Sequence, residues 1–278
     1  MPDLYSFSRK QENWNSLERL ENSPKRLLLD LRNPLEANLL DGCEYIFHLA
    51  AMPGLSLSWQ ETKLYIDCNV LGTANLLHAC DVSSIKKFIY VSTSSVYGKI
   101  INGDESSPVA PISPYGVSKL ASENLVSAFS EATGMPFTII RPFSVYGPRQ
   151  REDMAFNIFI RKMLKNEEIK IFGDGSQSRT NTFVSDLIQG LTHGMKNGRP
   201  GEIYNLSGNE EHSVIEVIST LEELLGRTSK LQFTAERLGD QKSTYTASTK
   251  ARKDFNYSPA TSLKEGLSKQ IEWQIANP

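Results

Sequence analysis

The stretch KKFIYVSTSS, residues 86–95, predicts a buried β-strand that ends in a cluster of hydroxyl side chains. A later segment, SPYGVSKLASENL, residues 113–125, predicts the start of a helix. Ser113 is a preferred N-cap residue, and Pro114 suits the first helical position. A strand followed by a helix in this way predicts a βα unit of a parallel sheet.

The same alternation continues on both sides of this unit. Because near-continuous apolar strands are typical of parallel sheets covered on both faces, the chain is predicted to be an α/β protein. Residues 1–150, with part of 180–208, are expected to form a nucleotide-binding domain, and residues 151–278 mainly a smaller substrate-binding part. Further strands are predicted at 25–31, 44–51, 135–147 and 201–207, extended segments within 168–186, and helices at 64–80, 114–132, 154–166, 213–226 and 263–276.

The composition excludes several classes of protein. The 278 residues include 30 Lys+Arg and 32 Asp+Glu, a formal net charge of -2, which argues against a nucleic-acid partner. Cys43, Cys68 and Cys80 have no CxxC spacing and are expected to be buried thiols in a reducing compartment. No apolar run approaches the roughly 20 residues that span a bilayer, and the opening MPDLYSFSRKQ lacks a signal-peptide core. The sequence therefore predicts a cytoplasmic protein that does not bind membranes.

Tyr115 and Lys119 lie four residues apart, on one face of the predicted helix. A lysine ammonium next to a tyrosine favours the phenolate and lowers the tyrosine pKa from its usual value of about 10. Such a tyrosine could remove a proton from a substrate hydroxyl during hydride transfer. This spacing also occurs by chance on many helices, and hydroxyl residues are common at solvated strand ends. Both features together, in this order after a strand and at a helix start, favour an active site.

Six motifs occur in order along nearly the whole chain: HLAA (48–51), VSTSSVYG (91–98), SPYGVSK (113–119), RPFSVYGPRQ (141–150), FGDGSQSRTNTFVSD (172–186) and RLGD (237–240). Together they resemble the extended short-chain dehydrogenase/reductase family, in particular its nucleotide-sugar epimerases and dehydratases. The resemblance implies a Rossmann-type doubly wound parallel sheet, NAD as the cofactor and a nucleotide sugar as the substrate. It also implies a homodimer whose interface is formed by the helices near 64–80 and 114–130; the alternative is that these helices are buried within one chain.

The resemblance assigns roles to individual residues. Thr93, Tyr115 and Lys119 match the catalytic positions, and Tyr115 and Lys119 would also contact the cofactor. Arg179 and Arg237 match positions near the nucleotide diphosphate. Guanidinium groups bind phosphate in bidentate fashion, which supports this role, although either arginine could be a surface charge. Cofactor contacts are implied for Asp30, Leu31, Leu49, Ala50, Ala51 and Asn69, and substrate contacts for Ser94, Ser95, Ser144, Phe172, Arg179, Arg237 and Asp240.

The residues after Thr93 bear on the reaction. Dehydratases of the resembled family place an Asp-Glu pair there, whereas this chain has Ser94 and Ser95, which cannot act as a carboxylate acid and base. Epimerisation at C4 needs only reversible hydride transfer through a 4-keto sugar. The sequence therefore favours a 4-epimerase of the UDP-glucose, UDP-glucuronate or UDP-N-acetylhexosamine type. A dehydratase, a reductase or a non-catalytic nucleotide-sugar-binding relative remain as alternatives.

The sequence departs from the resembled pattern at its beginning. The family's first βα unit carries a glycine-rich turn that holds the cofactor pyrophosphate, but the first glycine here is Gly42. The segment 4–20 is similar to the family's second strand and the residues just after that strand, so roughly 30 residues are expected to be absent. That loss would open a gap beside the HLAA strand, to be filled by residues 4–8 or by a partner chain, and would weaken NAD binding.

Histidines are not expected to have a catalytic or metal-binding role. His48 ends a buried strand and is predicted to be a hydrogen-bonded core residue. His78, His193 and His212 have no ligand spacing, so no metal is expected.

Overall fold

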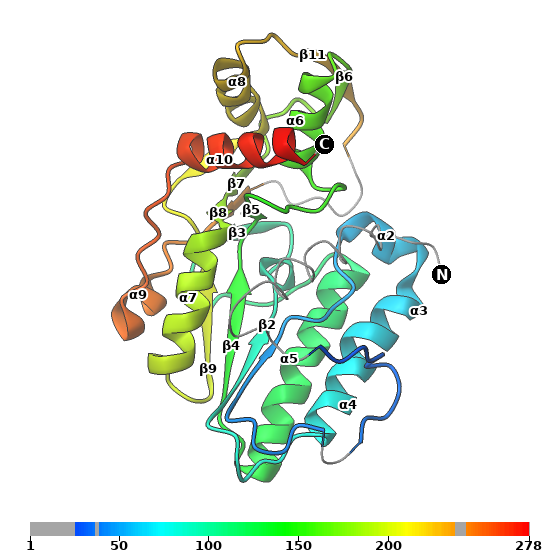
Figure 1. Ribbon diagram of the computed structural model, residues 1–278, viewed down its shortest axis with the longest axis vertical. Coiled ribbons are helices and arrows are strands. Elements are labelled where there is room, and N and C mark those ends of the chain that lie inside the picture. Colours follow the sequence, from blue (N-terminus) through cyan, green and yellow to red (C-terminus); the bar gives the residue numbers. More distant parts are fainter. Residues whose placement is uncertain (1–25, 37–38, 237–242, 278) are drawn as a thin grey trace. The chain divides into compact units, whose positions relative to one another are not determined.

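The computed structural model describes residues 26–36, 39–236 and 243–277 (Figure 1). Residues up to Asp30 and residues from Leu31 onward form two units, and each is considered by itself. The predicted segment 4–8 lies outside the described residues.

The second unit contains a four-stranded parallel sheet in the order β1-β2-β4-β9. Its inner strands are buried on both faces, as predicted for a parallel sheet. Tyr90 pairs with His48 on one side and with Ile139 on the other. The predicted α/β fold with a Rossmann-type parallel sheet is confirmed. The strands are β1 (Tyr45–His48), β2 (Lys87–Val91), β4 (Phe137–Pro142) and β9 (Glu202–Leu206).

Helices cover both faces of this sheet (Figure 1). One layer is formed by α2 (Leu55–Gln60), α3 (Thr62–Tyr65), the π-helical turn η1 (Ile66–Leu71), α4 (Gly72–His78) and α5 (Pro114–Thr133). The opposite layer is formed by α7 (Val184–Asn197) and α9 (Thr249–Phe255).

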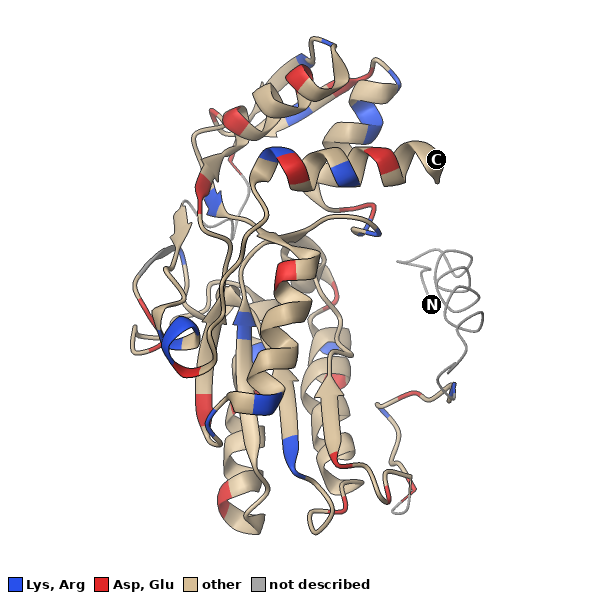
Figure 2. Cartoon of the chain, turned by 60° about the vertical axis from the view of Figure 1, so that its left-hand side comes forward, with Lys and Arg blue, Asp and Glu red and all other residues tan. Residues whose placement is uncertain are grey.

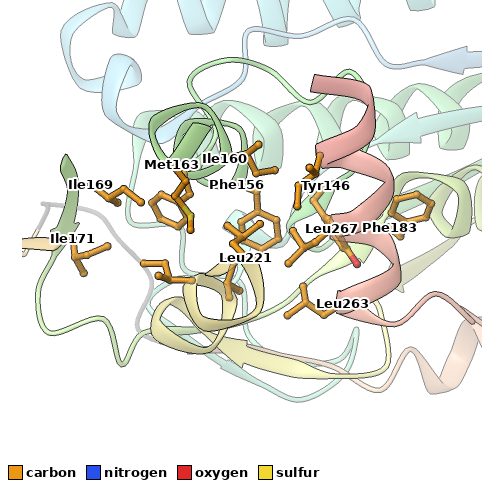
Figure 3. Packing of buried hydrophobic residues seen from close by; sticks show 14 residues of the cluster. Tyr146, Phe156, Ile160, Met163, Ile169, Ile171, Phe183, Leu221, Leu263 and Leu267 are labelled. Carbon is orange, nitrogen blue, oxygen red and sulfur yellow. The ribbon is translucent and has the colours of Figure 1, made fainter. Parts of the chain in front are cut away.

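A second hydrophobic cluster lies in the C-terminal part of the chain (Figure 3). Its centre includes Ile160, Leu221 and Leu267, all buried completely. The elements that carry it are α6 (Ala155–Leu164), β6 (Glu168–Phe172), α8 (Val214–Leu225), β11 (Lys230–Thr234) and α10 (Leu263–Ala276).

Short strands and one 3-10 turn complete the described part. One mixed sheet has the order β10-β7-β12-β3, and a separate pair joins β5 to β8. These elements are η2 (Ser94–Val96), β3 (Ile100–Asn102), β5 (Val145–Tyr146), β7 (Ser178–Thr180), β8 (Thr182–Phe183), β10 (Glu211–Ser213) and β12 (Ser243–Tyr245).

Three expectations are corrected. Residues 26–30 form no strand and Leu31 lies in a turn, although 25–31 was predicted as a strand; an apolar run forms a strand only where a neighbour accepts its backbone hydrogen bonds. The strand β1, at the edge of the sheet in the described part, is buried on one face only: Ile46 and His48 are buried, whereas Tyr45 and Phe47 are exposed. The extended segment predicted to run to residue 186 ends at Phe183, where α7 begins.

Three further observations concern the charged residues, the thiols and the apolar character of the helices. Basic and acidic residues are interspersed along the described helices and strands (Figure 2). Cys43, Cys68 and Cys80 are present as thiols, but they are half-buried and not fully buried as expected. Within the described residues, no helix has the length and apolar character to cross a bilayer.

Candidate active site

Several of the predicted site residues from the first half of the chain follow the carboxyl ends of the strands of the parallel sheet. Leu49, Ala50 and Ala51 directly follow β1, and the hydroxyl cluster Ser92–Ser95 follows β2. Because β1 and β2 are parallel neighbours, the loops after these two strands emerge side by side. This edge is where ligands bind in open α/β sheets.

The start of α5 is fixed against the loop after β2. The Ser113 hydroxyl caps the helix by accepting from the Gly116 amide at 3.1 Å, and Pro114 occupies the first turn, as predicted. A β-carbon on Gly116 would lie 2.6 Å from the Ser95 carbonyl oxygen, so only glycine allows this approach. The close contact brings Tyr115 and Lys119 to the hydroxyl cluster.

Lys119 is buried beneath this edge, with 2% of its surface exposed. Its ammonium donates to the Val91 carbonyl oxygen at 2.8 Å and lies 4.2 Å from the centre of the Tyr90 ring. Burial lowers the pKa of Lys119 to about 7, and the Glu123 carboxylate opposes this effect. Lys119 can therefore change its charge near neutral pH.

Thr93 and Tyr115 complete the predicted catalytic set. The Thr93 hydroxyl accepts from the Ser95 amide at 3.1 Å, which leaves its own proton available to a ligand oxygen. The half-buried Tyr115 ring packs edge-on against Tyr65 at 6.1 Å, and the Tyr65 hydroxyl donates to the Pro53 carbonyl oxygen at 2.7 Å. Two aromatic rings thus tie α5 to the loop after β1.

Asn69, in the π-helical turn η1, organises the same loop. Its side-chain oxygen accepts from the Met52 amide at 2.7 Å, and its nitrogen donates to the Met52 carbonyl and to the Ser118 hydroxyl. The Asn69 carbonyl also accepts from Ser122, which joins η1 to α5. Asn69 therefore supports the predicted cofactor loop through protein contacts.

His48 is a core histidine, as predicted. It is buried, and its Nε2 shares a 2.9 Å hydrogen bond with the Thr73 hydroxyl. Burial, with the nearby Lys119 charge, lowers the pKa of His48 to about 3, so it stays neutral at physiological pH.

Three polar residues at this edge were not predicted as site residues. Glu123 and Arg141 form a buried ion pair, and the Ser92 hydroxyl donates to Glu123. One signal was available in the sequence, since Glu123 follows Lys119 by four residues on the same helix face. Arg141 gave none, because the spacing within one strand does not show which helix residue it meets.

A family model described as the NAD dependent epimerase/dehydratase family matches residues 3–207. The chain belongs to this family. The resemblance drawn from the sequence motifs is thereby confirmed.

Individual relatives of this family member are similar over most of its length. An uncharacterized UDP-glucose epimerase, YtcB, from Bacillus subtilis (strain 168) is 43% identical over 242 residues, covering 85% of this chain and 76% of that protein. A UDP-glucuronate 4-epimerase from Thermodesulfobacterium geofontis (strain OPF15) is 33% identical over 281 residues, covering 99% and 86%. The crystal structure of UDP-glucuronic acid 4-epimerase from Bacillus cereus, in complex with UDP-glucuronic acid and NAD, is 37% identical with a TM-score of 0.92, covering 97% and 87%.

The family name implies NAD, and the residues at the nicotinamide end of the site fit it. Lys119 uses one ammonium proton on the Val91 carbonyl, which leaves donors for ribose hydroxyls. Tyr115 lies one helical turn before Lys119 at the start of α5 and is half-buried. A glycine-rich turn for the pyrophosphate is not among the residues of this sequence.

The remaining predicted residues lie elsewhere or outside the description. Asp30 belongs to the first unit and Leu31 to the turn that opens the second, where its carbonyl accepts from Asn75 at 2.7 Å. Ser144 joins β4 to β5, Phe172 ends β6 and Arg179 lies in β7, where it donates to the Ser178 carbonyl oxygen. No hydrogen bond or ion pair described for these three joins them to α5. Arg237 and Asp240 lie outside the described residues.

Two other features of this family member do not enter the site. A cavity of about 360 Å³ is lined by Met163, Asn166, Glu167 and residues 227–230, none of them a predicted site residue. Its position between the ends of α6 and α8 makes it a feature of the C-terminal part. Among the described residues, no group of three or more His, Cys, Asp or Glu could hold a metal ion.

Proposed function

We propose that this chain is an NAD-dependent nucleotide-sugar 4-epimerase that acts on a UDP-hexose, with UDP-glucuronate and UDP-glucose as the first substrates to test. The observation that carries the proposal is the junction of α5 with the end of β2. There, the Gly116–Ser95 contact holds α5, the helix of Tyr115 and the buried Lys119, against the loop that contains Thr93, and Lys119 donates to the Val91 carbonyl oxygen just before that loop. The relatives named as UDP-sugar epimerases support the choice of substrate.

Each residue has a defined task in this reaction. Tyr115, as a phenolate next to the Lys119 ammonium, removes the proton of the sugar C4 hydroxyl and later returns it. Thr93 donates a hydrogen bond to the same oxygen, which stabilises the developing charge. NAD supplies a hydride acceptor and donor at C4. The 4-keto sugar turns over between the two transfers, so the configuration at C4 inverts.

The loop after Thr93 favours epimerisation over elimination. Ser94 is buried and begins η2, and Ser95 gives its amide to Thr93 and its carbonyl to the Gly116 contact. Neither hydroxyl can serve as the carboxylic acid that protonates a leaving hydroxyl or as the carboxylate that takes the neighbouring proton. The 4-keto sugar therefore keeps all of its oxygen atoms.

The experiment combines cofactor binding with product analysis. Purified protein is titrated with NAD and with UDP, and then incubated with NAD and each UDP-sugar while products are followed by proton NMR and mass spectrometry. We expect the C4 epimer at unchanged mass. A product that has lost one water would instead indicate a dehydratase. Binding of UDP-sugar without any binding of NAD would refute the enzyme and leave the non-catalytic binding protein.

Replacing Tyr115 by Phe tests the proton-transfer step. We expect Tyr115→Phe to lower turnover by about 10²- to 10⁴-fold, because the general base is lost while the ring and its contact with Tyr65 remain. The matched control is Tyr45→Phe, which removes a hydroxyl from the exposed face of β1. Equal effects of the two variants would remove Tyr115 from the mechanism.

The assembly and the compartment belong to the same proposal. The outer faces of η1 and α5 expose Ile66, Leu71 and Val117, and these two elements pack side by side. A shared apolar surface of this kind supports a homodimer formed through these helices. Three thiols in a chain without a disulfide among its described residues support a reducing, cytoplasmic location.

A further inference from the structure

Among the ion pairs of the described residues, Glu123 and Arg141 form the one in which both side chains are buried, each 3% exposed. The contact is bidentate: Arg141 Nη2 donates to Glu123 Oε2 at 2.5 Å, and Arg141 Nε donates to Oε1 at 2.9 Å. The Ser92 hydroxyl adds a third donor to Oε1. The Glu123 carboxylate is therefore held by two neighbouring strands, by β4 directly and by β2 through the loop after it.

Stability alone is a poor explanation for such a pair. Removing two charges from water costs several kcal/mol per ion, and apolar residues of similar size often replace a buried pair without loss. The position of the pair suggests another role. Glu123 lies one turn after Lys119 on α5, and Ser92 directly precedes Thr93. The pair thus connects the helix that carries the lysine to the segment that carries the catalytic threonine.

Arg141 also contacts Tyr97, at the end of the segment that begins at Ser92 and includes Thr93. The Arg141 guanidinium lies 4.8 Å from the centre of the Tyr97 ring, and the Tyr97 hydroxyl donates to Asn205 in β9 at 2.8 Å. Residues 92–97, which include Thr93, are therefore anchored at both ends by contacts that start from Glu123 and Arg141.

The charged surroundings of Lys119 single out Glu123. From β1, His48 faces Lys119 and is neutral at physiological pH; from β2, the Tyr90 ring covers it, and burial raises the pKa of that phenol. On α5 itself, Tyr115 precedes Lys119 by one turn and Glu123 follows it by one turn.

The other elements packed against α5 add little charge at this point. From η1, Asp67 is paired with Lys63 at 2.5 Å on the surface, and Cys68 is half-buried. From β4, Arg141 pairs with Glu123 directly. On α4, the His78 ring meets Phe129 edge-on near the far end of α5. Glu123 is thus the carboxylate that acts on Lys119.

We propose that Glu123 is a positioning residue of the active site: held by Arg141 and Ser92, its carboxylate favours the charged form of Lys119 and fixes the Thr93 segment against α5. This deepens the proposed function and rests on it for its biological meaning. The role is electrostatic as well as geometric, so the charge of residue 123, and not only its size, determines the behaviour of Lys119.

The test measures the protonation of Lys119 without substrate or cofactor. The free energy of unfolding in urea is measured from pH 5 to 10 for each protein and for the same protein carrying Lys119→Met. The value of the Lys119→Met form is then subtracted from the value of the form that keeps Lys119. The contributions of groups that do not interact with Lys119 cancel. This difference in unfolding free energy is constant below the pH at which the folded Lys119 loses its proton, and it rises above that pH. The pH at which the rise begins, called the break, therefore reports the deprotonation of Lys119.

Three variants are compared with the wild type. We expect Glu123→Gln to lower the break by about one pH unit, because an opposite charge has been removed. The double variant Glu123→Gln/Arg141→Met removes both charges of the pair, so no guanidinium is left buried without its carboxylate and this variant folds even where the single variant does not. Its break should lie between those of the single variant and the wild type. Glu123→Asp keeps the charge and should restore the break.

Two results would overturn the proposal. One is a break that stays at the wild-type pH in Glu123→Gln or in the double variant, which would make the pair merely structural. The other is a break in Glu123→Asp that is as low as in Glu123→Gln. Because no ligand is used, either result leaves the epimerase proposal standing, and a failure to find epimerase activity leaves this result standing.

Discussion

At the scale of single residues, Lys119 connects pH with both stability and chemistry. Its pKa falls from its ordinary value of 10.5 to about 7 in the folded chain, so between these values the unfolded chain holds one more proton. Stability therefore rises with pH across this window, by about 1.4 kcal/mol per pH unit, and is lost as pH falls from 10.5 to 7. Below pH 7 the full cost of burying the charge opposes folding.

Replacing Lys119 by Met should remove this dependence. We expect Lys119→Met to be more stable than the wild type below pH 7, with an advantage that shrinks steadily up to about pH 10. Urea unfolding at several pH values measures it. Lys63→Met, at an exposed position on α3, is the control and should leave the pH profile unchanged. Parallel profiles for Lys119→Met and the wild type would contradict the lowered pKa.

The sequence indicated this chemistry only in part. The four-residue spacing of Tyr115 and Lys119 and the cap at Ser113 follow from helix geometry, so they were predictable. The burial of Lys119 was not, because it depends on Tyr90 and His48, which belong to two other strands. For the same reason Arg141, far from Glu123 along the chain, could not be assigned to the site before the strands were placed.

At the scale of elements, the junction of α5 with the β2 loop depends on Gly116. A β-carbon there would lie 2.6 Å from the Ser95 carbonyl oxygen and 2.9 Å from the Pro111 β-carbon, neither of which is the end of a flexible side chain. We expect Gly116→Ala to destabilise the protein, because overpacking costs about 1–3 kcal/mol and exceeds the gain in helix propensity of at most about 1 kcal/mol. The temperature of thermal unfolding and the turnover rate should both be lower than in the wild type.

Gly194→Ala is the matched control for this prediction. Gly194 lies within α7, and a β-carbon there would meet Ile140 at 3.5 Å, an ordinary contact. The gain in helix propensity should then dominate, and the unfolding temperature should stay equal or rise. If Gly116→Ala were as well tolerated as Gly194→Ala, the close approach of α5 to Ser95 would not be needed for the site.

Helices and buried strands were the elements most open to prediction. α5, α6, α8 and α10 begin and end within two residues of the expected bounds, because caps and apolar periodicity are local signals. The π-helical turn η1 gave no such signal, since the extra residue in the turn is stabilised by contacts of Asn69 with Met52 and Ser118. The run at 25–31 failed as a strand because strand formation depends on a neighbour that its own sequence does not reveal.

At the scale of the whole molecule, the proposed dimer makes the outer surface of η1 and α5 an interface. Leu71 in η1 is 44% exposed and Val117 in α5 is 47% exposed, a common arrangement where a second copy covers an apolar face. An interface of standard size buries about 800 Å² per partner, which two packed helices can supply. Unlike the fold, the dimer interface cannot be derived from the sequence pattern, because amphipathic helices bury the same residue types within a chain and between chains.

Introducing a charge into this surface should separate the two copies. We expect the wild type to have twice the 31.1 kDa mass of one chain, and Leu71→Glu to weaken the dimer by at least about 2 kcal/mol, roughly thirtyfold, because a carboxylate would be buried without a partner. Sedimentation equilibrium over a range of concentrations measures both. Ile275→Glu, at a 58% exposed position on α10, is the control and should remain dimeric. A wild type that is monomeric at all concentrations, or an equal effect of Ile275→Glu, would exclude this interface.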